Sequence, residues 1–555
     1  MSFRTLAELA PLAAVALLGW LLPSIPASVW ALPSRLLRRF TRTRARAVLW
    51  SALLTYVACA LLSWLNPPVP RVVDEFSYLL ASDTFAHGRL TNPPHPLGEH
   101  FEALHVLPAP TYQSKYPPGQ GLFLAAGQAL TGRPIVGVWL SMAAGAAALC
   151  WMLLAWMPPR WALLGALLPA FRFGSLALWD ENWFAYWATT YWGGAVGLLG
   201  GALVFGALPR LLGRARPRDA ALLGLGLIVL ANSRPFEGLA AAIPAAIVLC
   251  VWASRRWRAA ARAAAAVVAV VAAGFAAMGY YNYRGTGDPL KMPYVLYTER
   301  YDVAPVLVFG ELRTGKTFHH ESMRAYHAGF VVDGYRLKRG GAGLSWAHVE
   351  LAPKFFWGFA LWLPVLFAFS GPLRRWSFLA ALVVILSMLA SAASSYADKL
   401  RPHYIAPAAP LFVFLAVAGL RQLRALRFRG RRLGRPVAEA IVVISLLSVA
   451  LGSAFRIMYG APYEDSPLLR DKPAMAAKLL ADGGMDLVLV HYAPDHNTHD
   501  EWVYNGADLE GAPIVWARDL GDERNRRLLD YYSGRKVWKL YADEQPPRLE
   551  PYSER

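Results

Sequence analysis

The chain has 555 residues, of which 56% are hydrophobic and only 17% are charged. Soluble domains carry about 25% charged residues, so the composition excludes an ordinary soluble protein and favours one with several membrane spans. The net charge of +19 does not indicate nucleic acid as a partner, because the arginines gather in short segments between apolar blocks. This positive-inside pattern predicts a lipid bilayer as the partner and places these segments in the cytoplasm. The segments are Arg35–Arg46, Arg210–Arg218, Arg255–Arg262 and Arg421–Arg435.

Twelve apolar blocks predict an all-α polytopic membrane protein, with eleven spans if the first block, which Pro23 and Pro26 interrupt, is not one. They lie at about 7–31, 47–66, 134–157, 161–178, 191–208, 219–233, 236–253, 263–281, 354–371, 377–395, 404–420 and 437–458. With the arginine-rich segments inside, the long loops 67–133 and 282–353 lie outside, as do all 12 histidines. The Arg and Ala bias is typical of a high-GC bacterial genome, so the expected location is the bacterial inner membrane with the working surface facing the periplasm.

The composition divides the chain into a membrane domain, 1–458, and a soluble domain, 459–555. In the second part AMAAKLLADGG predicts a helix, and MDLVLVHYA, APIVWARDL and RKVWKLYAD predict short strands, so a small α/β domain is expected. His491, His496 and His499 could suggest zinc, but their spacing fits no established site and a surface loop is favoured. The three cysteines fall inside apolar blocks and indicate buried thiols rather than a disulfide framework.

An acidic pair, Asp74 and Glu75, follows the second span by only a few residues. A helix through DEFSYLLASDTFAHG would place Asp74, Tyr78 and Ala81 along one face. A carboxylate at the headgroup level could accept a proton from a hydroxyl or hold a divalent metal. An aspartate that opens an amphipathic helix is equally ordinary as an N-cap, and both interpretations stay open.

The first long loop, 67–133, ends with TYQSKYPPGQGLFLAAGQAL. Two prolines fix an extended entry into a helix that begins near Gly119, and Lys115 lies just before them. A cation held there could bind a phosphate, although a lysine that only anchors the loop at the interface is as plausible.

The stretches VVDEFSYLLASDTFAHGRLTNP and YPPGQGLFLAAGQ resemble the GT-C superfamily of polyprenyl-phosphate-sugar-dependent glycosyltransferases. The resemblance is to glycosyltransferase family 39 and protein mannosyltransferases, to aminoarabinose transferases and to RgtA/B/C/D-like bacterial membrane proteins. It extends over about 47–458 in architecture, but only these two stretches are specific. The family usually has Lys or His directly before Pro-Pro, whereas here Tyr116 follows Lys115 and could itself donate a hydrogen bond to a phosphate oxygen.

The resemblance implies a donor sugar linked to a polyprenyl phosphate and an acceptor hydroxyl of unknown origin, on a protein, a lipid or a glycan. Asp74 would be the general base of an inverting transfer, and Glu75 would support it or bind sugar hydroxyls. No nucleotide cofactor is implied, and a divalent metal stays possible.

Further polar residues could complete such a site at the outer ends of later spans. Arg234 lies at a tight turn between two spans, and Arg401, His403 and Tyr404 lie at another, where basic and aromatic residues suit a lipid phosphate and equally suit interface anchoring. Asp180 and Glu181, in a Trp- and Tyr-rich stretch, are a second candidate acidic pair. Tyr294, Tyr297 and Tyr301 in the second long loop, 282–353, could line an acceptor channel or simply pack.

Two other functions remain as alternatives to a membrane glycosyltransferase. A transporter or flippase for a lipid-linked glycan would be expected to show paired halves and charges inside its spans, and these spans contain almost none. A non-catalytic scaffold that displays the C-terminal domain is disfavoured by the acidic pair at the membrane edge.

Overall fold

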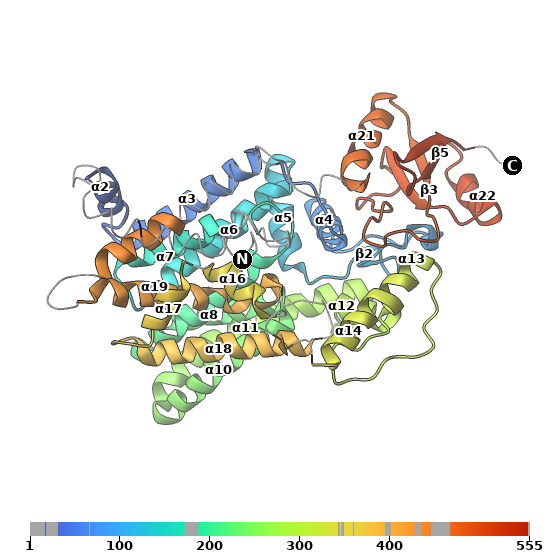
Figure 1. The fold of residues 1–555 in the computed structure, drawn as a ribbon. Helices are drawn as coiled ribbons and strands as arrows, with labels where there is room; N and C mark the ends of the chain where they lie inside the picture. Colours follow the sequence, from blue (N-terminus) through green and yellow to red (C-terminus); the bar gives the residue numbers. More distant parts are fainter. Residues whose placement is uncertain are drawn as a thin grey trace.

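The computed structural model describes residue 17 and residues 31–65, 67–172, 187–341, 344–345, 349–358, 360–394, 401–427, 434–445 and 467–552. Long helices lie side by side at one end of the molecule, and a small unit of strands and helices lies at the other (Figure 1). The short helices and strands of the two long loops lie between them (Figure 1).

Seven helices in the described part are long and apolar enough to cross a membrane. They are α3 (Arg44–Leu65), α6 (Ile135–Leu153), α8 (Gly194–Arg214), α10 (Pro235–Arg255), α11 (Trp257–Thr286), α18 (Arg374–Ala393) and the continuous pair η5 (Pro402–Ala408) and α19 (Ala409–Ala425). The shorter α2 (Ala31–Phe40) precedes them in sequence, and α7 (Pro159–Arg172) and α9 (Pro217–Ala231) lie among them. The expected class of all-α polytopic membrane protein with a small C-terminal α/β part is thereby confirmed.

Several of the expected spans look different or lie partly outside the described residues. The block at 354–371 forms two short helices, α16 (Leu351–Trp357) and α17 (Trp362–Phe367), because Gly358 has φ 49° and ends the first of them. A left-handed residue cannot continue a right-handed helix, and glycine adopts this conformation at little cost. Nearly all of the first expected block lies outside the described residues, and only 437–445 of the last block is described.

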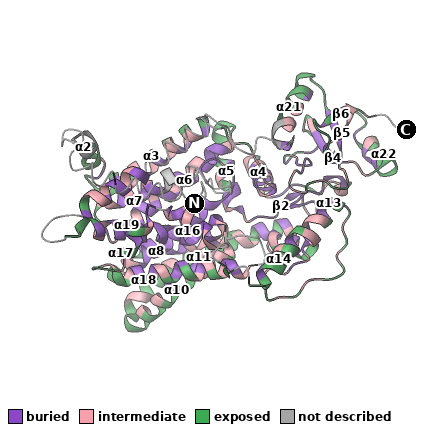
Figure 2. Cartoon of the chain, viewed as in Figure 1, coloured by how far each residue is buried: buried purple, intermediate pink, exposed green. Residues whose placement is uncertain are grey.

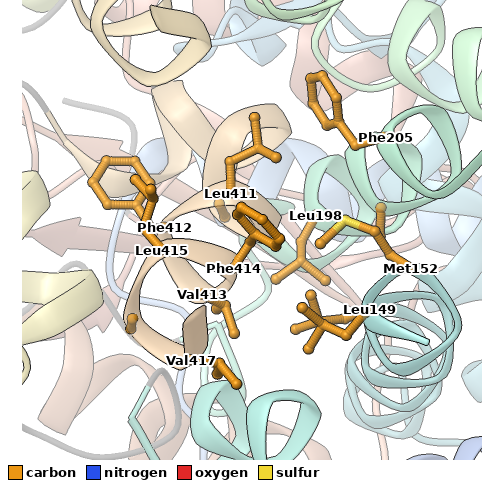
Figure 3. Close-up of a cluster of buried hydrophobic side chains, with 14 of the residues drawn as sticks. Leu149, Met152, Leu198, Phe205, Leu411, Phe412, Val413, Phe414, Leu415 and Val417 are labelled. Carbon is orange, nitrogen blue, oxygen red and sulfur yellow. The ribbon is translucent and has the colours of Figure 1, made fainter. Parts of the chain in front are cut away.

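The membrane helices form a bundle with a buried centre and an apolar exterior. In the most apolar stretch of the segment Pro402–Ala425, 94% of the residues are buried inside the protein, whereas in that of Trp257–Thr286 only 6% are. Helices α6, α8 and α19 therefore form the core, where Leu149, Leu198 and Phe414 lie together (Figure 3). Helices α10, α11 and α18 carry many exposed residues (Figure 2), and the apolar ones among them, such as Val268 and Phe275, suit contact with lipid rather than with water.

The two long loops contain most of the remaining elements. The first contributes α4 (Val73–Ala86), η2 (Gly98–Phe101), β1 (Val106–Leu107), β2 (Gln113–Ser114) and α5 (Pro118–Thr131). The second contributes α12 (Pro293–Tyr301), α13 (Glu321–Arg324), the π-helical segment η3 (Ala325–Phe330) and α14 (Val331–Arg339). The predicted helices after Val73 and near Gly119 are therefore present.

The C-terminal unit is a four-stranded sheet with one helix before its first strand and a second helix between its second and third strands in sequence. Its elements are α21 (Pro467–Ala481), β3 (Asp486–His491), β4 (Ile514–Arg518), α22 (Asp522–Tyr531), β5 (Lys536–Tyr541) and β6 (Arg548–Pro551). The strand order is β4-β3-β5-β6, with β3 parallel to both of its neighbours and β6 antiparallel. The predicted helix and three strands are all present, whereas α22 and β6 were not predicted.

This unit packs against α4, the helix that carries the acidic pair. Phe76 of α4 stacks on Tyr504 with ring centroids 4.4 Å apart, and the Tyr504 hydroxyl donates to the Leu104 carbonyl oxygen at 3.0 Å. The Ala507 N–H donates to Asp83 Oδ2, near the end of α4, at 2.7 Å. The C-terminal unit therefore fixes one face of α4.

A buried ion pair lies at the centre of this contact. Arg518 donates to a Glu501 carboxylate oxygen, to the Glu102 carbonyl oxygen at 2.7 Å and to the Ser322 hydroxyl at 2.9 Å. One guanidinium thus connects the C-terminal unit with both long loops. Buried charges are tolerated when they are paired and hydrogen-bonded in this way.

Replacing Arg518 is expected to destabilise the protein strongly. The variant Arg518→Ala leaves the Glu501 carboxylate buried without its cation, which typically costs about 3–5 kcal/mol of unfolding free energy. Denaturant unfolding of the detergent-solubilised protein measures the loss. Arg548→Ala is the control, because Arg548 pairs with Glu544 on the surface of the same unit and its removal should leave stability nearly unchanged. An equal effect of both variants would contradict the structural role of Arg518.

Candidate active site

Glu75 organises the beginning of α4. Val72 has extended backbone angles, and the Glu75 carboxylate turns back to accept the N–H groups of Arg71 at 2.7 Å and Val72 at 3.2 Å, as in a capping box. Its other oxygen accepts the Tyr191 N–H at 2.8 Å, and the side chain is almost fully buried. Burial raises the pKa of Glu75 to about 7, against the effect of these backbone donors. The two acidic residues therefore have different roles, since Glu75 rather than Asp74 caps the N-terminus of α4.

Asp74 points to a different group of side chains. The Tyr116 hydroxyl donates a hydrogen bond to Asp74 Oδ1. His105 Nδ1 lies 3.1 Å from the same hydroxyl and 3.7 Å from Asp74 Oδ1. The Asp74 side chain is 25% exposed, so its carboxylate is held on one side and accessible on the other.

Lys115 is a buried cation among tyrosine rings. Its Nζ lies 4.5 Å from the ring centroid of Tyr297 and 5.3 Å from those of Tyr116 and Tyr294. No carboxylate among the described residues forms an ion pair with Lys115, and the residue is only 4% exposed. Burial therefore lowers the pKa of Lys115 to about 8, although Asp302 and Asp74 act in the opposite direction. Cation–π contacts offset part of this cost while they leave the ammonium without an anion.

A second cationic and aromatic group lies at the beginning of α10 and in η5. The Arg234 guanidinium lies 5.4 Å from the Tyr404 ring centroid and 3.9 Å from Glu237 Oε1. His403 packs between Tyr404 and Trp192, with centroid distances of 4.4 and 4.6 Å. The predicted residues of the two turns are therefore brought together.

Tyr78 connects this group with Asp74. The Tyr78 ring, one turn after Asp74 on α4, stacks on Tyr116 at 4.4 Å, and the charges of Arg234, Asp74 and Glu237 all act on its hydroxyl. The charges of Asp74, Arg234 and Arg401 likewise act on the His403 and Tyr404 rings. The structure thus assembles one site from Asp74, Lys115, Tyr116, Arg234, Arg401, His403 and Tyr404. Asp180 and Glu181 lie outside the described residues.

Sequence reasoning missed several polar residues that border this site. His105, Tyr326, His327 and Asp302 form hydrogen bonds around Lys115 and Tyr116, and none of them stands in a recognisable motif. Tyr297, considered as a channel residue, is fully buried against Lys115. The only available signal was the position of the histidines in the long loops.

The described residues contain no group of three or more His, Cys, Asp or Glu arranged to hold a metal ion. The three histidines of the C-terminal unit have separate partners. His491 contacts Asp519 at 3.0 Å, and His496 contacts Asp543 at 2.6 Å. His499 packs on the Phe330 ring at 4.9 Å.

The different surroundings of the acidic pair predict different effects on stability. Glu75→Gln replaces an accepting oxygen with a donor that faces backbone N–H groups, which should cost about 1–3 kcal/mol of unfolding free energy. In Asp74→Asn the amide oxygen can still accept from Tyr116, so the change should stay within about 1 kcal/mol. Thermal and denaturant unfolding of both variants in detergent measures the difference. Equal stability of the two variants would contradict the assignment of Glu75 as the helix cap.

No protein-family model and no curated protein matches the chain. Among solved structures, ArnT from Cupriavidus metallidurans bound to undecaprenyl phosphate is 15% identical over 88% of this chain and 92% of its own, with a TM-score of 0.48. Its apo structure gives the same values.

A second similarity is to the oligosaccharyltransferase of Archaeoglobus fulgidus. Its apo form is 10% identical over 89% of this chain and 69% of its own, with a TM-score of 0.40. The same protein, AglB, in complex with an inhibitory peptide and a dolichol-phosphate gives a TM-score of 0.38.

Proposed function

We propose that this chain is a membrane glycosyltransferase that moves a sugar from a polyprenyl-phosphate-linked donor to an acceptor hydroxyl on the periplasmic side of the bacterial inner membrane. The observation that carries the proposal is the pairing of two features in one site. A carboxylate with one free oxygen, Asp74, and a buried cation, Lys115, lie against the same side chain, Tyr116, and Lys115 has no carboxylate partner among the described residues. A base for a hydroxyl and a cation for a phosphate are what the reaction requires.

The reaction follows from these positions. The acceptor hydroxyl gives its proton to the free oxygen of Asp74 while its own oxygen forms a bond to the anomeric carbon. The bond from that carbon to the phosphate oxygen breaks, and attack from the opposite side inverts the configuration. The phosphate gains negative charge as it leaves, and Lys115 and Arg234 stabilise that charge in a site shielded from water. The neutral Tyr116 hydroxyl stabilises Asp74 in its ionised form.

The aromatic residues suit the remainder of the donor. Tyr404 and His403 lie at the start of the most deeply buried membrane segment, Pro402–Ala425, so a phosphate beside Arg234 would leave a polyprenyl tail next to apolar helices.

Transfer of label from polyprenyl-phosphate sugars tests the function directly. The native protein in liposomes should move radiolabelled sugar to a membrane extract, and Asp74→Asn should lower kcat by about 10²–10⁴-fold because it removes the base. Asp333→Asn is the control, since Asp333 lies in the second long loop, is exposed and is paired with Arg336. Equal activity of Asp74→Asn and the native protein would exclude Asp74 and make Asp180 the next residue to replace. No transfer over a broad donor panel, with flipping of lipid-linked glycans in the same liposomes, would favour the transporter alternative.

The state of Lys115 predicts a pH dependence of lipid-phosphate binding. Burial lowers the pKa of Lys115 to about 8, so without bound lipid the Lys115 ammonium loses its proton, and with it the positive charge, as the pH rises through that value. The affinity for polyprenyl phosphate should therefore be highest below pH 8 and fall about tenfold per pH unit above it. Lys115→Arg keeps its charge and should show a flat profile, while Lys115→Met should bind weakly at every pH.

Titration of a fluorescent polyprenyl phosphate into the detergent-solubilised variants gives these affinities. Lys291→Met is the control, because this lysine of the second long loop is exposed and paired with Glu299. Tight binding of polyprenyl phosphate by Lys115→Met at pH 7 would contradict the assignment of Lys115 as a phosphate ligand.

A further inference from the structure

His105 occupies the point where the two long loops meet. It is a buried residue with φ 65°, in the left-handed region that residues other than glycine seldom adopt. Strained backbone of this kind persists only where the surroundings hold it, and it is concentrated at functional sites. Hydrogen bonds to both the backbone and the ring of His105 stabilise this conformation.

Three elements fix the backbone of His105. Its N–H donates to the Tyr297 hydroxyl at 2.8 Å. Its carbonyl oxygen accepts the Ser77 hydroxyl at 2.7 Å and the Lys115 N–H at 3.1 Å. Because Ser77 follows Asp74 by three residues on α4, His105 is tied to both the proposed base and the proposed phosphate ligand.

The hydrogen bonds of the His105 ring have only one consistent direction. An ionised carboxylate only accepts, so the single Tyr116 hydroxyl hydrogen is used on Asp74 Oδ1. The Tyr116 oxygen must therefore accept from His105 Nδ1, at 3.1 Å. His105 Nε2 then has no hydrogen and accepts from the Tyr326 hydroxyl, also at 3.1 Å. The proton of the neutral ring is thereby assigned to Nδ1.

A second series of hydrogen bonds supports the backbone of His105 from the other side. The Tyr297 oxygen accepts the His105 N–H, so its own hydrogen goes to His327 Nε2 at 3.1 Å. His327 Nδ1 then donates to Asp302 Oδ1 at 2.7 Å. This series thus ends in the Asp302 carboxylate of the second long loop, which fixes the tautomer of His327 and, through Tyr297, the position of residue 105.

We propose that His105 is a positioning residue for Asp74, and that its Nδ1–H fixes the Tyr116 hydroxyl so that only the second oxygen of Asp74 is open to the acceptor hydroxyl. This inference rests on the proposed transferase function. Burial keeps the imidazole neutral, since it lowers the pKa of His105 well below its usual value, with Lys115 acting in the same direction. A neutral ring can donate from Nδ1 without adding a second cation beside Lys115.

Asparagine and glutamine distinguish the two ring nitrogens. The amide nitrogen of His105→Asn lies near the place of Nδ1, and asparagine tolerates a left-handed backbone. The amide nitrogen of His105→Gln lies near the place of Nε2 and cannot donate to Tyr116. We expect His105→Asn to keep most of the transfer activity. His105→Gln and His105→Ala should lower kcat by about 10–100-fold, the range typical of residues that orient a reacting group through another side chain, with an unchanged KM for the donor.

The pH profile separates positioning from a merely structural role. Without the Nδ1–H donor, Tyr116 stabilises the Asp74 carboxylate less well, so the acidic limb of kcat/KM should move to higher pH in His105→Gln and stay in place in His105→Asn. In a Tyr116→Phe background, His105→Gln should have little further effect, because His105 acts through the missing hydroxyl. Thermal unfolding of each variant identifies any that fail to fold.

Each outcome decides one question. A pH profile of His105→Gln like that of the native protein, or full additivity with Tyr116→Phe, would overturn the positioning role. Equal loss in His105→Asn and His105→Gln, with both proteins folded, would do the same. If the native protein transfers no sugar from any donor, the proposed function fails first and this inference falls with it, whereas an active native protein with a fully active His105→Gln refutes the inference alone.

Discussion

The backbone of Tyr191, just before α8, accepts a hydrogen bond from one helix of the first long loop and donates one to another. Its N–H donates to Glu75 of α4 at 2.8 Å, and its carbonyl oxygen accepts from Gln120 of α5 at 2.8 Å. A buried carboxylate needs N–H donors of this kind. If the Glu75 side chain adopted another direction, both its carboxylate and the Tyr191 N–H would be left buried without a hydrogen-bond partner. Two helices of the loop are in this way attached to the beginning of one core membrane helix. The direction of Asp74, the residue before Glu75, follows from that attachment.

Helix α4 consequently has two occupied faces. Asp74 and Tyr78 face the cations and tyrosines at the ends of the membrane helices, while Phe76 faces Tyr504 of the C-terminal unit. The C-terminal unit therefore packs directly on the helix that carries Asp74. Arg518 strengthens this arrangement because its guanidinium reaches both long loops at once.

Local patterns in the sequence predicted those features that depend on local physics. The apolar blocks predicted most of the membrane helices, and alternation between turn residues predicted β3, β4 and β5. The strand β6 was missed because RLEP carries no apolar alternation. At the site, Asp74, Lys115 and Tyr116 were predicted because they lie in two short motifs at the membrane edge.

His105 could not have been predicted in the same way. Its importance comes from contacts with Tyr297 and Tyr326, which are 192 and 221 residues away in the chain. No spacing rule extends over such a separation, and an isolated histidine in a polar loop looks like any other. The different roles of Asp74 and Glu75 could not be predicted either, since two adjacent carboxylates look alike in the sequence. Only the structure shows that the backbone N–H donors lie beside Glu75.

The tyrosine surroundings of Lys115 also bear on how fast the proposed enzyme turns over. A phosphodiester donor brings one negative charge to this ammonium, whereas the monoester left after transfer carries about 1.5 to 2. A cation that is shielded from water, and that has no carboxylate partner in the part of the chain the structure describes, attracts the monoester more strongly than the diester. The same charge that eases departure of the sugar thus also retains the spent carrier and slows its escape into the bilayer.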